Sequence, residues 1–159
     1  MCGKPARGES DGGALPSKAV DLTIAVTDQV DDEIRAQLNA AIQAASLDIV
    51  GPFCPKPLAI LIHNSEGCLV GGLIGRTMWG WVQIELLWIE ASLRGAGHGR
   101  RLMAHAEAEA RRRGCHHARL DTYSFQAPGF YEKCGYRRIG TLEDFPEGHE
   151  RYFYAKQLG

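Results

Sequence analysis

The residues best suited to bind a ligand are three alternating glycines in the segment Gly95–Gly99, flanked by Arg94, Arg100 and Arg101. The segment lies between a run of strand character and a run of helical character. Glycines let a backbone approach a ligand closely. The free N–H groups and the positive dipole end at a helix start bind anions. The pattern predicts a phosphate or pyrophosphate site, and the alternative is a glycine-rich turn that holds no ligand.

Two common phosphate-binding motifs do not fit this loop. In a dinucleotide fingerprint the third glycine would fall on Arg100, and the strand before the loop closes a meander instead of opening a βαβ unit. A Walker loop needs Gly-Lys-Ser/Thr, whereas Gly99 is followed by two arginines. The loop alone therefore does not identify its ligand.

Two motifs in order are more specific than one loop. The run from Leu87 to Gly99, L-x-I-x-x-x-x-R-G-x-G-x-G, resembles the acyl-CoA-binding motif of the GNAT superfamily of N-acetyltransferases. The run from Ala127 to Tyr136, A-x-x-F-Y-E-K-x-G-Y, resembles the second motif of that family. The resemblance implies a single-domain α+β fold with a central, mixed, mostly antiparallel sheet of about seven strands flanked by helices.

The resemblance also implies how a coenzyme would be held. The loop amides would bind the pyrophosphate, and the strand before the loop would splay from its neighbour. A backbone N–H near Ile89 would face the thioester carbonyl as an oxyanion-type donor. At position 124 this chain has a serine where the family usually has asparagine, with shorter reach. The expected coenzyme-binding residues are Leu87, Trp88, Ile89, Arg94, Gly95, Ala96, Gly97, His98, Gly99, Arg100 and Ser124.

Two residues are candidates for proton transfer. An amine must be neutral to attack a thioester, which calls for a general base. Glu85 would share a strand face with Ile89 if no bulge intervenes. The alternative is a polar residue on a solvated strand face, and Glu90 has the opposite parity. Tyr131 matches the family tyrosine that often protonates the departing thiolate, and its alternative is a core aromatic residue.

The acceptor pocket is less well marked. Trp79, Trp81 and Trp88 are typical of cross-strand packing, although Trp79 or Trp81 could line an acceptor groove. Tyr123 and Phe125 follow a strand end, where residues of open sheets often reach a cleft. Four polar residues in or beside the last hairpin could attract a cationic amine, but a surface loop explains them as well. They are Asp144, Glu147, His149 and Glu150.

The elements that position these residues follow from periodicity. We expect a strand over residues 22–26 and a helix capped by Asp28 or Asp31. Three strands in a meander then lead to the glycine loop, a helix with an apolar stripe that ends at Gly114, and another strand. A short helix from Pro128 and two closing strands complete the domain. Residues 1–18 are expected to form a flexible leader, and residues 19–159 the N-acetyltransferase domain.

The amino-acid composition indicates which classes of binding partner and which cellular compartment to expect. Eighteen basic residues against nineteen acidic ones give a net charge of −1, so we expect neither nucleic acid nor membrane as a partner. Five cysteines without a C-x-x-C spacing indicate a reducing, cytoplasmic environment. Adjacent residues of a strand point to opposite faces, so the Cys115–His117 row does not predict a metal site. A homodimer is left open.

These observations predict an enzyme that moves an acetyl group from acetyl-CoA, as cosubstrate and without a metal, to a primary amine of a small molecule. Direct attack of the amine on the thioester is the expected mechanism. Two alternatives stay open. A non-catalytic acyl-CoA-binding module would need the same loop, and a protein N-acetyltransferase would share the fold and differ in its acceptor loops. Glu85 and Tyr131 favour the enzyme.

Overall fold

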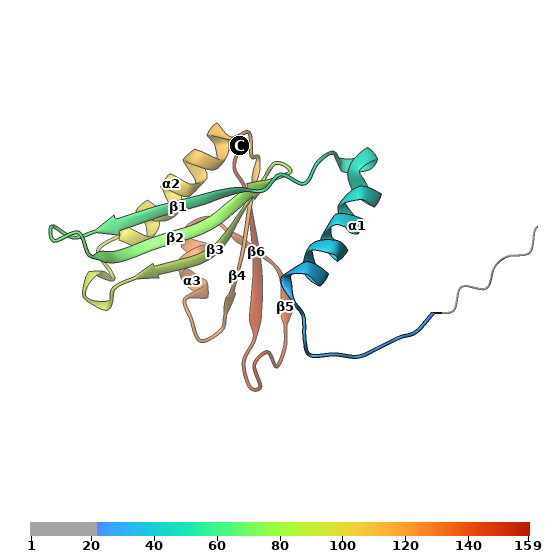
Figure 1. Ribbon diagram of the computed structural model, residues 1–159. Helices are drawn as coiled ribbons and strands as arrows, with labels where there is room; N and C mark the ends of the chain where they lie inside the picture. Colours follow the sequence, from blue (N-terminus) through green and yellow to red (C-terminus); the bar gives the residue numbers. More distant parts are fainter. Residues whose placement is uncertain (1–21) are drawn as a thin grey trace, which may run out of the picture. The chain divides into compact units, whose positions relative to one another are not determined.

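The computed structural model describes residues 22–159, in which six strands form one mixed sheet of order β1-β2-β3-β4-β6-β5 (Figure 1). The strands are β1 (Lys56–His63), β2 (Leu69–Met78), β3 (Trp81–Ile89), β4 (His117–Tyr123), β5 (Arg137–Leu142) and β6 (Arg151–Gln157). The helices are α1 (Asp32–Val50), α2 (His98–Arg112) and α3 (Pro128–Lys133), with a short 3₁₀ turn, η1 (Ala91–Leu93), before the glycine loop. The expected α+β class is confirmed. The expected leader, residues 1–18, lies outside the described residues.

Among the described residues, 22–42 belong to one unit, and residues 43–159 form a second that contains the whole sheet. The first unit contains the beginning of α1, where the Asp31 carboxylate accepts a hydrogen bond from the Ile34 N–H at 2.7 Å. Of the two predicted caps, Asp31 is the one that acts. The strand expected over residues 22–26 does not form, so the sheet has six strands rather than about seven. A strand needs a hydrogen-bonded neighbour, which local sequence cannot supply.

The predicted meander is present. β1 pairs antiparallel with β2, and β2 with β3, while β4, β6 and β5 form a second antiparallel group. The two groups meet at one parallel pair, β3 with β4. Period-2 alternation sends Leu73, Val82 and Tyr154 into the core, where each is fully buried.

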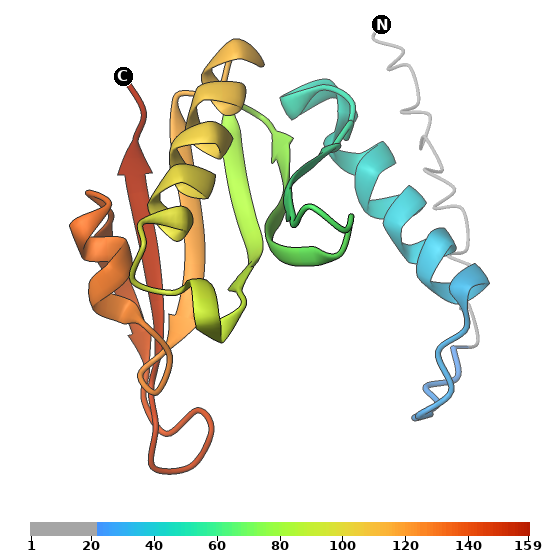
Figure 2. The same cartoon turned by 90° about the vertical axis from the view of Figure 1, so that its left-hand side faces the viewer.

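One face of the sheet is covered by α2 and α3, and we call it the helix face (Figure 2). The predicted stripe of α2 is confirmed, because Leu102, Met103, Ala106 and Ala110 are all buried. The helix ends as expected, with Gly114 in the left-handed region at φ 80°. We call the other side of the sheet the opposite face.

A buried ion pair connects the helix face to the sheet. The Lys156 ammonium on β6 contacts both carboxylate oxygens of Glu107 on α2 at 2.8 Å, and it also donates to the Cys134 carbonyl at the end of α3. The Glu107 side chain is only 8% exposed. Because a carboxylate this buried needs a partner, the pair specifies how both helices sit on the strands.

Among residues 22–159, none of the helices is long and apolar enough to cross a membrane.

Candidate active site

The central feature of the sheet is a split between β3 and β4. These two parallel strands pair only at Trp81–His117, Val82–Ala118 and Gln83–Arg119. β3 then continues to Ile89 and β4 to Tyr123 without further pairing, and the two halves of the sheet diverge from their shared end (Figure 1). The splay that the resemblance implied is therefore present.

Backbone groups of β3 face this split. The Glu90 N–H bonds to the Val70 carbonyl at 2.9 Å, so residue 90 points toward β2. Because hydrogen-bonding direction alternates along a strand, Trp88 also pairs toward β2, and Leu87 and Ile89 direct their backbone groups toward β4. Leu87 can thus present both its backbone donor and its acceptor to a ligand in the split, and Ile89 its N–H, since the Ile89 carbonyl accepts a hydrogen bond from Arg94. Trp88, which was expected to do the same, has its backbone engaged with β2.

A β-bulge lies at Glu85. On β2, Ile74 and Gly75 are consecutive, but their partners on β3 are Leu86 and Ile84, so Glu85 is the extra residue. Gly75 is required at this point, because a Cβ there would collide with the Gln83 carbonyl oxygen. Glu85 would share a strand face with Ile89 only on a strand without a bulge, and here a bulge intervenes.

The bulge sends Glu85 to the opposite face, while the Ile89 side chain is buried on the helix face. There the Glu85 carboxylate forms an ion pair with Arg76 of β2 at 3.0 Å. About a third of the Glu85 side chain is exposed, which leaves it accessible from the opposite face. Sequence reasoning missed Arg76 and the bulge. A bulge is a mismatch in register between two strands, so the residue types of one strand do not reveal it.

The glycine loop has an unusual run of unsatisfied backbone donors. Within the described chain, the N–H groups of residues 95–100 have no hydrogen-bond partner, and the first bond of the turn runs from the Arg101 N–H to the Gly97 carbonyl. Gly95 and Gly97 take left-handed conformations at φ 81° and 83°. No acidic residue occupies the first turn of α2. Six free donors at the positive end of a 15-residue helix form a strong anion cradle.

Two contacts hold the loop against the site. The Arg94 Nε–H donates to the Ile89 carbonyl at 2.9 Å, which fastens the loop to the end of β3. Gly99 lies close to the Phe130 ring of α3, since a Cβ at Gly99 would be 3.2 Å from it. The short helix α3 thus packs beside the glycine loop. The Arg94 side chain thus has a structural role in the loop, and Arg100 and Arg101 add further positive charge at the start of α2.

Tyr131 of α3 lies on the helix face. Its ring packs 6.2 Å from that of Tyr154 and 6.5 Å from that of Tyr136, measured between centroids. Burial raises the pKa of the Tyr131 phenol above its usual value, with the charges of Cys134 and Asp121 adding to the effect. Its hydroxyl makes no hydrogen bond within residues 22–159. A phenol in this setting is fully protonated at neutral pH and has a proton to donate.

Ser124 connects the end of β4 to the β5–β6 hairpin. Its hydroxyl accepts a hydrogen bond from the Glu150 N–H at 3.1 Å, and its own N–H donates to the Glu150 carbonyl at 2.8 Å. The hydroxyl is also 3.5 Å from His149 Nδ1. Its contacts thus support the hairpin beside the split.

The tryptophans and Cys115, which the sequence analysis considered for an acceptor groove or a metal site, lie in different environments. Trp81 stacks on His117 across β3 and β4 at 4.5 Å, in agreement with cross-strand packing. Trp79 and Trp88 are about half exposed. Cys115 is buried in the core. Within residues 22–159, no three His, Cys, Asp or Glu side chains are grouped so as to hold a metal ion.

Comparison with known proteins identifies the family. The sequence model of the acetyltransferase (GNAT) family matches residues 28–136. The chain is 34% identical over 137 residues to acetyltransferase Atu2258 of Agrobacterium fabrum, covering 86% of this chain and all of that protein. The chain belongs to the GNAT acetyltransferase family. It is also 46% identical over 96 residues to blasticidin-S acetyltransferase of Streptomyces morookaense, or 60% of this chain and 71% of that one.

Solved GNAT structures agree with the fold. A crystal structure of an acetyltransferase from Bacillus cereus superposes with a TM-score of 0.76 at 29% identity, covering 84% of this chain and 97% of that one. This GNAT protein is therefore an acetyl-CoA-dependent acetyltransferase, and the split, the loop and the short helix occupy its candidate active site. Membership of a family of named enzymes favours catalysis over the non-catalytic module.

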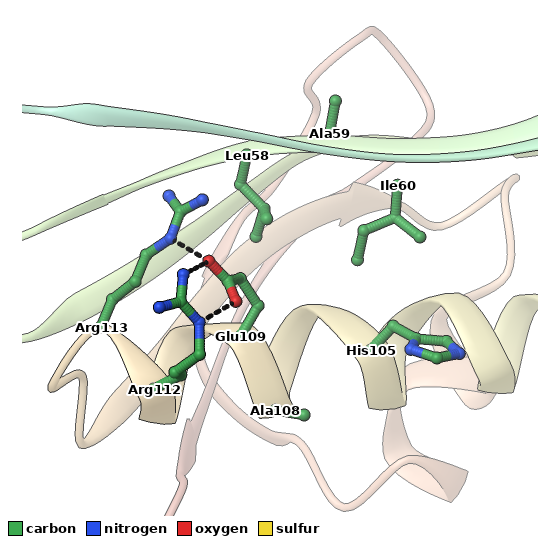
Figure 3. A pocket seen from close by; sticks show the side chains of 8 residues that line it. All are labelled: Leu58, Ala59, Ile60, His105, Ala108, Glu109, Arg112 and Arg113. Atoms are coloured by element: carbon green, nitrogen blue, oxygen red, sulfur yellow. Dashed lines mark hydrogen bonds and ion pairs between the residues drawn. The ribbon is translucent and has the colours of Figure 1, made fainter.

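A hollow of about 480 Å³ between β1 and the C-terminal half of α2 is distinct from these GNAT features (Figure 3). Its carboxylate, Glu109, is held by Arg112 and Arg113, whose hydrogen bonds lower the pKa of Glu109 to about 2. Arginine donors occupy both carboxylate oxygens of Glu109, so neither oxygen is free to accept a proton from a substrate. None of the glycine-loop residues, Glu85 or Tyr131 lines this hollow, and we do not assign it to the reaction.

The loop of this GNAT enzyme yields a test of coenzyme binding. A Gly97→Val variant places a β-branched side chain at a left-handed position inside the anion cradle. We expect acetyl-CoA affinity to fall at least about 10-fold, because the pyrophosphate loses its close approach to the amides. Isothermal titration calorimetry with acetyl-CoA measures this.

The matched control is Gly114→Val at the other end of α2. Gly114 has nearly the same φ, 80°, and as open a surrounding, so it carries the same backbone strain away from the cradle. Equal affinity losses in the two folded variants would show that strain alone, and not the cradle, explains the effect.

Proposed function

We propose that this enzyme transfers an acetyl group from acetyl-CoA to a primary amine of a small molecule, by direct attack of the amine on the thioester. The observation that carries the proposal is the row of free N–H groups at residues 95–100, which stands next to the wide end of the β3–β4 split. If the pyrophosphate of the coenzyme binds to this row, its pantetheine arm can extend along the backbone of Leu87 and Ile89. When bound, acetyl-CoA supplies an acyl group activated by a thiol leaving group.

The two faces of the sheet would then have different tasks. The glycine loop and Tyr131 belong to the helix face, so this side receives the coenzyme. Glu85 and Arg76 belong to the opposite face, which would receive the amine. This division suits acyl transfer, because the amine can attack the thioester carbonyl from a face that the coenzyme does not cover, and the C–S bond then breaks to release the thiolate on the helix face. The Ile89 N–H, which points into the split, would stabilise negative charge on the carbonyl oxygen.

Glu85 and Tyr131 would handle the protons. As the new C–N bond forms and the C–S bond breaks, the amine loses a proton and the thiolate gains one. Glu85, directly or through a water molecule, accepts the proton of the amine. Tyr131, which like any tyrosine of ordinary or raised pKa holds its proton at neutral pH, donates to the thiolate. The phenolate is then neutralised from solvent.

The choice of a small acceptor is supported by the relative from Streptomyces morookaense, which is named as an acetyltransferase of blasticidin-S. The test is an assay of thiol release from acetyl-CoA with blasticidin S, a panel of simple primary amines and lysine-containing peptides. We expect turnover with small amines and little with peptides. Turnover with peptides alone would replace the proposal with a protein N-acetyltransferase.

Replacement of Glu85 tests the base. Glu85→Gln keeps the size of the side chain and removes its proton-accepting charge. We expect kcat to fall about 10²-fold at pH values below the pKa of the amine, and the deficit to shrink as pH rises and the free amine predominates. A kcat–pH profile measures it. Glu90→Gln is the control, because Glu90 bonds to Ser92 outside the split. Full turnover of Glu85→Gln at every pH would contradict the assignment.

Tyr131→Phe tests the acid. The change keeps the ring and its packing and removes only the unpaired hydroxyl, so stability and acetyl-CoA affinity should stay close to those of the wild type. We expect kcat to fall about 10²-fold, near the lower end of acid–base effects, because a thiolate leaves readily. Steady-state kinetics and thermal unfolding measure both quantities.

Tyr136→Phe is the matched control for the acid, since Tyr136 is buried in the core and adjoins the Tyr131 ring. A loss of stability in Tyr131→Phe without a loss of rate per folded molecule would leave Tyr131 as a core aromatic residue.

A further inference from the structure

Three aromatic rings gather where β4 ends. Tyr123, the last residue of β4, stacks nearly parallel to Phe125, with ring centroids 5.2 Å apart and an interplanar angle of 13°. Phe145, from the β5–β6 hairpin, lies 6.3 Å from Tyr123 at 19°. The three rings thus present roughly parallel planes from two separate segments of chain. We call this group the aromatic platform.

The platform lies at the wide end of the split. β3 extends six residues beyond its last pairing with β4, to Ile89, and β4 extends four residues, to Tyr123. At about 3.3 Å per residue, both ends lie some 13–20 Å past the point of divergence. Tyr123 alternates with the buried Thr122 and Leu120, so its side chain belongs to the opposite face, as does Glu85. The platform and the candidate base thus share the face that we assign to the amine.

The rings are held in place by contacts beneath and beside them. The Arg151 guanidinium lies 5.5 Å from the Tyr123 centroid and 5.7 Å from that of Phe145, and its charge is matched by an ion pair with Asp121 at 2.6 Å. The Phe145 N–H donates to the His149 carbonyl at 2.8 Å. Rings fixed in this way lose little conformational freedom when a ligand stacks on them.

The platform is nevertheless accessible. Phe125 is 56% exposed and Phe145 46% exposed, and the Tyr123 hydroxyl makes no hydrogen bond within residues 22–159. Exposed, ordered aromatic side chains that adjoin a polar rim are typical of binding surfaces. Cross-strand packing explains Trp81, whose ring stacks on His117, but it does not explain rings that remain open to solvent.

The rim of the platform carries negative charge. Residues 143–150 contain four carboxylates, Glu143, Asp144, Glu147 and Glu150, and no lysine or arginine. A cluster of one sign beside a binding surface raises the local concentration of ligands of the other sign. An amine that is protonated in solution is such a ligand.

We propose that Tyr123, Phe125 and Phe145 form a stacking site for a planar ring of the acceptor, so that the preferred substrates are cationic amines that carry an aromatic or heteroaromatic ring. The inference rests on the proposed function and names the substrate class of that site. The ring rests on the β4 side of the split, and the amine reaches across to the thioester beside Ile89. The platform thereby determines specificity without taking part in the chemistry.

The test compares two amines that differ only in planarity, 2-phenylethylamine and 2-cyclohexylethylamine. Both carry the same amine on the same linker, and the saturated ring is at least as apolar. We expect the wild type to show about 3–10-fold higher kcat/KM for the phenyl compound, which is the range that aromatic stacking supplies. Phe125→Leu and Phe145→Leu should each abolish most of this preference by raising the KM of the phenyl compound, with the KM of acetyl-CoA unchanged.

Ile139→Ala is the control, since Ile139 is an exposed apolar residue of β5 outside the platform. It should leave the preference intact. Equal kcat/KM for the two amines in the wild type, or an unchanged preference in both leucine variants, would overturn the proposal.

A calorimetric titration of the protein–CoA complex with each amine keeps this test separate from the test of catalysis. Absence of thiol release with every amine would contradict the proposed function. In that event, preferential binding of 2-phenylethylamine, lost in Phe125→Leu, would still support the platform, and equal or absent binding of the two amines would overturn it.

Discussion

The whole arrangement depends on the termination of one hydrogen-bond ladder. β3 and β4 pair at three positions and then separate, although both strands continue. The separation leaves backbone donors and acceptors of Leu87 and Ile89 without strand partners, and such groups are costly when buried and unpaired. The split is thus at once a weak point of the sheet and a place where a ligand can complete a ladder. Contacts on the helix face and at the end of β3 stabilise the two strands in their separated positions.

Two kinds of contact maintain that shape. On the helix face, α2 buries Leu102, Met103, Ala106 and Ala110 against the strands of the first group, while α3 packs against the second. The Lys156–Glu107 ion pair joins the two groups through a carboxylate that would otherwise be buried without a partner. At the end of β3, Arg94 fastens the glycine loop to the strand. The anion cradle is therefore connected directly to the end of the strand that borders the split.

The bulge at Glu85 explains how one strand can serve both faces. Without the extra residue, Glu85 and Ile89 would point the same way and compete for the helix face. With it, the carboxylate turns to the opposite face beside Arg76, while the strand end keeps its backbone directed into the split. Gly75 makes this possible, because any side chain there would strike the Gln83 carbonyl. A glycine in a neighbouring strand thus decides where the candidate base points.

Local sequence patterns were sufficient to predict the parts of the domain that depend on local chemistry. Alternation and 3.6-residue periodicity predicted the meander, α2 and its stripe, and the spacing of the glycines predicted a helix start with free amides. These features come from residues near one another in the chain, so their signals are local.

Three other features form only when the chain has folded. The absence of a strand over residues 22–26, the bulge that turns Glu85, and the stack of Tyr123, Phe125 and Phe145 depend on which segments lie beside which. A strand is stabilised by its neighbour, a bulge by a mismatch between two strands, and a ring stack by two loops that meet. None of these partners is specified by the residues next to them in sequence, because the energies that select them arise only when distant segments pack together.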